Sequence, residues 1–121
     1  MTTTIDAIKI AAGDLERARV VAHNFATDVR LHFGVRLKAM RLYGSAARGD
    51  WSTASDIDVL VLLDHVESAD GDWMIHRAFE LGLGKSGLLL QPLFMAESDF
   101  AELLTRERLF ALEVRREGID L

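Results

Sequence analysis

The chain has 121 residues, half of them hydrophobic, and its 14 Lys+Arg against 19 Asp+Glu give a formal net charge of −5. This length predicts a single domain over residues 1–121, with no room for a second substrate-binding domain. The acidic balance argues against binding along duplex nucleic acid, and the lack of cysteine excludes disulfides, thiolate zinc sites and cysteine nucleophiles. No membrane span and no signal peptide is recognisable, so a cytoplasmic protein is expected.

The N-terminal part of the chain predicts one long helix. Apolar residues recur at steps of three and four over 14–33, with charged residues between them, and Gly34 is a typical helix stop. Residues 5–12 are expected to form a separate helical turn or two, because Gly13 loosens the join.

Two strands are predicted next, with a small, polar loop between them. Residues 36–43 alternate in a way typical of a strand, and residues 57–63 form a β-rich run that is apolar on both faces. Residues 44–55 are expected to form a loop with one helical turn. A second polar loop is expected over 66–72, followed by a helix over 73–83.

The C-terminal part predicts a third strand and two more helices. Residues 88–95 form the strand, and Pro92 inside it indicates an edge strand or a bulge. Asp99 and Glu102 resemble a capping box at the start of a helix, and a last helix over 107–117 is expected to stop at Gly118. The element order predicts an α+β (α/β-like) domain with a small mixed sheet flanked by helices.

Asp56 and Asp58 stand two residues apart at the start of the predicted strand 57–63. Side chains at i and i+2 of a strand point to the same face, so both carboxylates project together. Their mutual repulsion would raise the pKa of one of them, and a divalent cation would remove that penalty. The alternative is that Asp56 caps a turn and Asp58 is a solvated strand residue.

Gly44 and Ser45 follow the first strand directly and open the loop. Gly44 can take a positive φ or allow a close backbone approach, and Ser45 offers a hydroxyl and an N–H group to a phosphate. If the residues up to Arg48 begin a helical turn, their N–H groups also face an anion, and Arg48 adds a cation. Taken alone, a Gly-Ser pair is typical of an ordinary strand-to-loop turn.

Together, these residues form the pattern Gly-Ser-x10-Asp-x-Asp between two β-rich runs. The pattern resembles the signature of the DNA polymerase beta-like nucleotidyltransferase superfamily. More closely, residues 44–49 followed by 55–61 are similar to the minimal nucleotidyltransferase (MNT) group. The resemblance is densest over 42–64 and extends loosely over 14–121.

This resemblance implies a nucleotidyltransferase fold and the transfer of a nucleoside monophosphate from ATP or another NTP to a hydroxyl. It assigns Gly44 and Ser45 to the triphosphate, and Asp56 and Asp58 to Mg²⁺ and catalysis. Arg48 is added as a phosphate-binding residue from its position in the same loop.

The chain departs from the family pattern in one respect. Active members usually carry a third carboxylate on a neighbouring strand, whereas the strand 88–95 contains no Asp or Glu. Leu89 or Gln91 occupies the corresponding position, and Gln91 would be a weaker, neutral oxygen ligand. Glu67, Asp70 and Asp72 lie on the expected loop 66–72, from which they could reach inward, whereas Glu97 and Asp99 follow the strand and are assigned to the next loop and helix cap.

Other residue types give no competing site. His23, His32, His65 and His76 lack the close spacing of metal ligands. Trp51, between the two halves of the motif, is expected either to line a nucleotide or partner surface or simply to pack.

Three functions follow from the resemblance. The first is an Mg²⁺-dependent nucleotidyltransferase that transfers AMP to a hydroxyl of a protein partner, as the antitoxin-like component of a toxin–antitoxin module. The expected partner is a helical HEPN-type protein, and a homo-oligomer is also compatible. The second is a catalytically impaired binding module that neutralises a partner by contact alone, and the third is an antibiotic nucleotidyltransferase.

Overall fold

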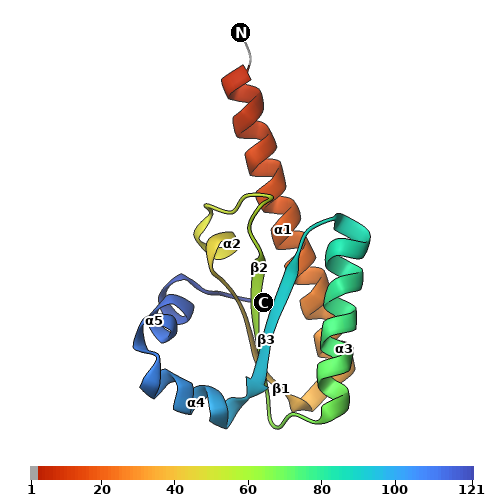
Figure 1. Ribbon diagram of the computed structural model, residues 1–121, viewed down its shortest axis with the longest axis vertical. Helices are drawn as coiled ribbons and strands as arrows, with labels where there is room; N and C mark the ends of the chain where they lie inside the picture. The colour runs from red at the N-terminus through yellow and green to blue at the C-terminus, as the bar shows by residue number, and fades with distance from the viewer. Residues whose placement is uncertain (1–2) are drawn as a thin grey trace.

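The computed structural model describes residues 3–121, which fold around one four-stranded sheet (Figure 1). The strand order is β3-β2-β1-β4; β1 is antiparallel to β2 and β4, and β2 is parallel to β3. The elements in chain order are α1 (Thr3–Phe33), η1 (Gly34–Arg36), β1 (Leu37–Tyr43), α2 (Ser45–Arg48), β2 (Ile57–Leu63), α3 (Ser68–Phe79), η2 (Glu80–Gly84), β3 (Leu90–Ala96), α4 (Glu97–Arg106), α5 (Arg108–Glu117) and β4 (Ile119–Asp120). The expected mixed sheet flanked by helices is confirmed.

The alternation of β2 divides the hydrophobic core between the two faces of the sheet. Side chains such as Ile57 and Val59 pack with α1 and α3 on one face. Leu60 and Leu62 pack with Val114 of α5 on the other. Figure 1 shows the sheet between α1 and α3 on one side and α4 and α5 on the other. Because both faces are covered along most of β2, its apolar run is nearly continuous, as expected.

Helix α1 continues through Gly13, so the expected break there is wrong. A single glycine in a helix interior costs about 1 kcal/mol relative to alanine. The long apolar stripe C-terminal to it, which includes Phe25 and Val29, anchors the helix on the sheet. None of the helices that the structure describes is long and apolar enough to span a membrane.

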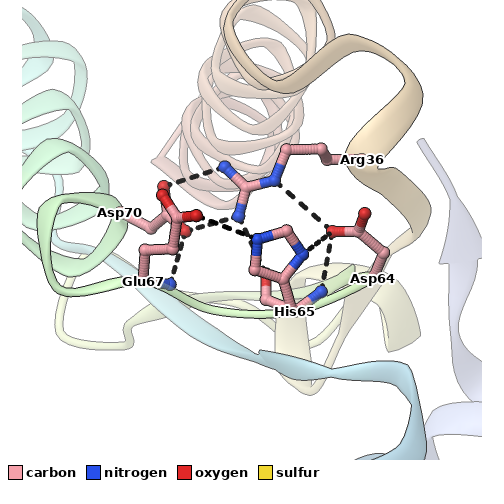
Figure 2. A network of polar contacts seen from close by, with 5 residues as sticks. All are labelled: Arg36, Asp64, His65, Glu67 and Asp70. Carbon is pink, nitrogen blue, oxygen red and sulfur yellow. Dashed lines mark hydrogen bonds and ion pairs between the residues drawn. The ribbon is translucent and has the colours of Figure 1, made fainter.

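Helix α3 begins at Ser68, earlier than the expected helix 73–83, and part of the expected loop 66–72 is therefore helical. A capping box between Glu67 and Asp70 sets this start. Figure 2 shows why Asp70 lies inside the structure: the guanidinium of Arg36 donates to both of its carboxylate oxygens, at 3.1 and 2.7 Å. The helix then continues through one π-helical turn, η2, before Gly87.

Helix α4 begins at Glu97, directly after β3, and its N-cap residue is Ala96. The expected capping box of Asp99 and Glu102 is therefore wrong, because the strand leads straight into the helix and fixes where the first turn starts. Helix α5 ends before Gly118, as expected.

The C-terminal strand β4, which the sequence did not indicate, is held beside β1 by Arg41. Its guanidinium donates to the carbonyl oxygens of Val114 (3.1 Å) and Gly118 (2.6 Å), where α5 ends, and forms an ion pair with Asp120 of β4. Arg41 thereby adds a second donor to the carbonyl oxygen of Val114, which also accepts from the N–H of Gly118, and supplies a donor to the carbonyl oxygen of Gly118 just past the helix end.

Strand β3 is an edge strand, as Pro92 indicated. The N–H of Ile57 donates to the carbonyl oxygen of Leu89 at 2.8 Å, so the backbone polar groups of Leu89 face β2. Because these groups alternate along a strand, position 92 faces the free edge. Proline lacks an N–H group, and it is tolerated there because no ladder bond is lost.

Candidate functional site

The Gly-Ser turn is a single helical turn held between two glycines that have positive φ angles. Gly44 has φ +73° and ψ −154°, and Gly49 has φ +97°. The N–H groups of Ala47 and Arg48 donate to the carbonyl oxygen of Gly44 at 3.1 and 3.0 Å. The earlier N–H groups of the turn, at Ser45 and Ala46, have no intrahelical acceptor in such a geometry and are suited to an anion.

Gly44 lies against Asp58, and this contact brings the two halves of the motif together. A Cβ atom built on Gly44 would lie 2.5 Å from Oδ2 of Asp58, closer than non-bonded atoms approach. Gly44 is therefore required both for its backbone angles and for the space beside the carboxylate.

Asp56 and Asp58 lie at the start of β2, on the sheet face that α4 and α5 cover further along. Asp56 is exposed and Asp58 is half-buried. Burial, followed by the charges of Asp56 and Glu113, raises the pKa of Asp58 to about 6, and Arg48 partly offsets this. A divalent cation would relieve the repulsion, so the donor set fits Mg²⁺. No trio of His, Asp or Glu placed to hold a metal occurs among the side chains that the structure describes.

Tyr43 is part of this environment although the sequence analysis did not single it out. It stands opposite Asp58 in the antiparallel pair of β1 and β2. Burial, with the charges of Asp58 and Glu113, raises the pKa of its phenol to about 12. Its ring meets that of Phe110 of α5 edge-on, with centroids 5.6 Å apart.

Arg48 is bound by carboxylates of α5 rather than left free beside the turn. Its guanidinium lies 2.9 Å from Glu113 and 3.3 Å from Glu117, and 3.4 Å from Asp50. The two glutamates are four residues apart, so they share a face of α5. That spacing was the signal in the sequence, but only the fold shows which element this face meets.

Arg19 of α1 supports the turn from the opposite side. Its guanidinium donates to the carbonyl oxygens of Ala46 (2.9 Å) and Ala47 (3.2 Å) in α2. These contacts hold the short helix in place and leave its N-terminal end open. The role of Arg19 could not be predicted from the sequence, because nothing local links position 19 to the turn.

The register of β2 and β3 decides which residue stands beside Asp58. Asp58 pairs with Gln91, whereas Leu89 precedes the strand. Of the two positions where the resemblance expects a third carboxylate, the one beside Asp58 is therefore Gln91, a neutral amide with an exposed side chain.

The remaining candidates have structural roles. Trp51 is 5% exposed, and its indole N–H donates to the backbone carbonyl oxygen of Asp56 at 3.1 Å, so it packs beneath the motif. Asp70 binds Arg36, and His65 pairs with Asp64 and Glu67 in the network of Figure 2, beyond the far end of β2.

Residues 24–115 match the family model described as "Nucleotidyltransferase domain". The chain belongs to this nucleotidyltransferase family. A curated relative from Methanocaldococcus jannaschii, named "Putative protein adenylyltransferase MJ0604", is 33% identical over 63% of this chain and 71% of its own. These matches confirm the superfamily that the motif indicated.

Solved structures share the nucleotidyltransferase fold. A mutant of the toxin–antitoxin MntA-HpeT is similar with a TM-score of 0.52 and 20% identity, over 82% of this chain and 70% of that one. A toxin–antitoxin crystallised with AMP-PNP gives a TM-score of 0.53 and 19% identity, over 80% and 69%. At these identities the likeness establishes the fold of this nucleotidyltransferase domain.

Proposed function

We propose that this nucleotidyltransferase domain transfers AMP from ATP to a hydroxyl of a protein partner, with Mg²⁺. The observation that carries the proposal is the contact of Gly44 with Asp58, because it sets an anion-binding turn directly beside a carboxylate pair. The turn suits the phosphates of a nucleotide, and the carboxylates suit the cation that accompanies them.

In the reaction, the turn at Gly44 and Ser45 would hold the triphosphate through the N–H groups of Ser45 and Ala46, while Asp56 and Asp58 would hold the cation. Mg²⁺ supplies charge neutralisation at the phosphates and lowers the pKa of the acceptor hydroxyl. A bond forms from the hydroxyl oxygen to the α-phosphorus, the bond from that phosphorus to the bridging oxygen breaks, and pyrophosphate leaves. The hydroxyl proton passes to solvent.

An apolar groove at the edge of β3, on the face of the sheet opposite the carboxylates, suits a protein acceptor that reaches round this edge to the site. It has a volume of about 370 Å³ and lies between α3 and β3, where Phe79, Leu83 and Leu89 are exposed. Gln91, which stands beside Asp58, lines the groove as well. The groove suits an apolar segment of a polypeptide, which would bring its hydroxyl to the site. The curated relative is likewise named as acting on protein, and the similar structures are toxin–antitoxins. We therefore propose a HEPN-type partner.

The test is label transfer from α-³²P-ATP to a candidate HEPN-type protein, in Mg²⁺ and in EDTA. We expect Mg²⁺-dependent labelling of the partner, reduced at least 100-fold by Asp56→Asn with Asp58→Asn. The same double variant should lose Mg²⁺-dependent binding of AMP-PNP in calorimetry. A wild-type protein that binds no nucleotide with Mg²⁺ would contradict the proposal.

The second candidate function is neutralisation of the partner by contact alone, and the neutral Gln91 beside Asp58 favours it. Under this proposal the double variant Asp56→Asn/Asp58→Asn neutralises a toxic partner as well as wild type does. Loss of neutralisation together with loss of labelling would support the enzyme instead. The third candidate, an antibiotic nucleotidyltransferase, has no specific observation in its favour among the residues that the structure describes.

A further inference from the structure

The guanidinium of Arg48 lies where it can bind either a phosphate in the turn or the carboxylates of neighbouring side chains. It closes the phosphate-binding turn at the end of α2, yet its guanidinium lies among the carboxylates of Glu113, Glu117 and Asp50. These ion pairs are partly solvated, with both glutamate side chains about as exposed as that of Arg48. Solvated ion pairs are weak, whereas a guanidinium binds phosphate oxygens with two parallel hydrogen bonds. A triphosphate in the turn would therefore compete for Arg48.

Glu113 is the partner of Arg48 whose charge also acts on Asp58 of the carboxylate pair. Its charge acts on both Asp58 and Tyr43, which stand opposite each other on β2 and β1. One turn earlier in α5, Phe110 packs against the ring of Tyr43 and fixes this face of the helix over the sheet. Glu117 acts on Arg48 but is not among the charges that act on Asp58.

The register of β3 places no carboxylate beside Asp58, so a carboxylate from another element could bind the cation there. Gln91 stands beside Asp58 and brings a neutral oxygen where a third anionic ligand would bind the cation more strongly. In the structure Glu113 binds Arg48. Among the residues that the structure describes, no three carboxylate or histidine side chains, Asp56, Asp58 and Glu113 included, are placed to hold one metal ion. A change of partner is thus required before Glu113 can serve the cation.

We propose that Glu113 exchanges Arg48 for the metal when a nucleotide binds, and becomes the third carboxylate of this site. The triphosphate draws the guanidinium of Arg48 toward the turn, and the released carboxylate turns toward Asp58. This inference rests on the proposed function, since it needs a nucleotide and a divalent cation at the same site.

The test measures Mn²⁺ binding by electron paramagnetic resonance, with and without AMP-PNP, in wild type, Glu113→Gln and Glu117→Gln. Glutamine at 113 can still accept a hydrogen bond from Arg48, so the fold is expected to persist, and thermal unfolding checks this. We expect Glu113→Gln to weaken Mn²⁺ binding about tenfold with AMP-PNP present and less than twofold without it. The matched control Glu117→Gln should bind Mn²⁺ like wild type with AMP-PNP present.

A second set of variants tests the exchange from the other side. Arg48→Gln should release Glu113 without nucleotide, strengthening Mn²⁺ binding several-fold while weakening AMP-PNP binding. Adding Glu113→Gln should remove that gain, whereas adding Glu117→Gln should leave it.

Equal effects of the two glutamate variants, in either set, would overturn the exchange while leaving the proposed function intact. A wild-type protein that binds no Mn²⁺ with AMP-PNP would overturn the proposed function and the exchange with it. The two failures are therefore distinguishable in one experiment.

Discussion

Gly44 combines a backbone constraint with a steric one, so its replacement tests the site directly. Gly44→Ala places a methyl group 2.5 Å from the Asp58 carboxylate at a positive φ. We expect a loss of about 2–3 kcal/mol in the free energy of unfolding and a loss of AMP-PNP binding. Urea denaturation and calorimetry measure the two effects.

Gly49→Ala is the matched control for Gly44→Ala. Gly49 also has a positive φ, but a Cβ there meets nothing within 4 Å. It should lose only about 1 kcal/mol of stability and keep its nucleotide binding. Equal damage at both glycines would show that the contact with Asp58 is unimportant.

The raised pKa of Asp58, about 6 against an ordinary value of 3.8, predicts a stability difference that depends on pH. Between these values the native state binds the proton that the unfolded state releases, so stability falls as pH rises. Asp58→Asn removes this penalty. The variant should equal wild type below pH 4 and exceed it by on the order of 1 kcal/mol above pH 6, given the partial solvation.

Urea unfolding of wild type and Asp58→Asn at pH 4, 5, 6 and 7.5 gives the difference in the free energy of unfolding. Contributions of the carboxylates that both proteins share cancel in this difference. A difference that stays constant with pH would contradict the raised pKa. Saturating Mg²⁺ and AMP-PNP should reverse the order at pH 7.5, since only wild type retains the full carboxylate pair.

At the scale of elements, the start of α3 depends on one buried carboxylate. Asp70 is 4% exposed; it accepts from the N–H of Glu67 and from the guanidinium of Arg36, which holds its pKa below the usual range. Asp70→Ala removes the cap and leaves Arg36 short of a partner. We expect a loss of about 2 kcal/mol in thermal or urea unfolding.

Asp64→Ala is the control for this network. Asp64 also pairs with Arg36, but at 3.4 Å and with a more exposed side chain. Its removal should cost less than about 1 kcal/mol. If the two variants were equally stable, the capping box would not determine where α3 begins.

The elements that the sequence predicted well are those whose pattern is local. Strand β2 was predicted over 57–63, as found, because the apolar run after Asp58 is unbroken up to Asp64. The start of α3 was missed because Asp70 is neutralised by Arg36, 34 residues earlier in the chain. In the sequence alone the pairing with Arg36 is not visible, and the acidic residues around Asp70 are typical of a solvated loop.

The same distinction holds for the candidate site. The motif predicted that Gly44 and Asp58 belong together, and the structure places them in contact. Arg19 and Glu113 reach the turn from helices 27 and 65 residues away in sequence, so no local pattern could place them there. Likewise, the choice between Leu89 and Gln91 required the strand register.

At the scale of the whole molecule, a ligand that binds only the native state must stabilise it. AMP-PNP with Mg²⁺ at about 100 times its dissociation constant should add about 2.7 kcal/mol, or roughly 10 °C in Tm. EDTA should abolish the shift, because the carboxylate pair and the triphosphate repel each other without the cation. Differential scanning fluorimetry measures it, and an equal shift in EDTA would argue against a metal-dependent site.

The position of Pro92 on the free edge of β3 has a consequence for how this molecule meets others. An incoming strand would find a gap in the row of donors there, so growth of the sheet into stacked copies or fibres is disfavoured. A polypeptide that binds at this edge must be recognised through its side chains, in the groove that Pro92 helps to line. One residue thus keeps the edge beside the carboxylates accessible while protecting it from aggregation.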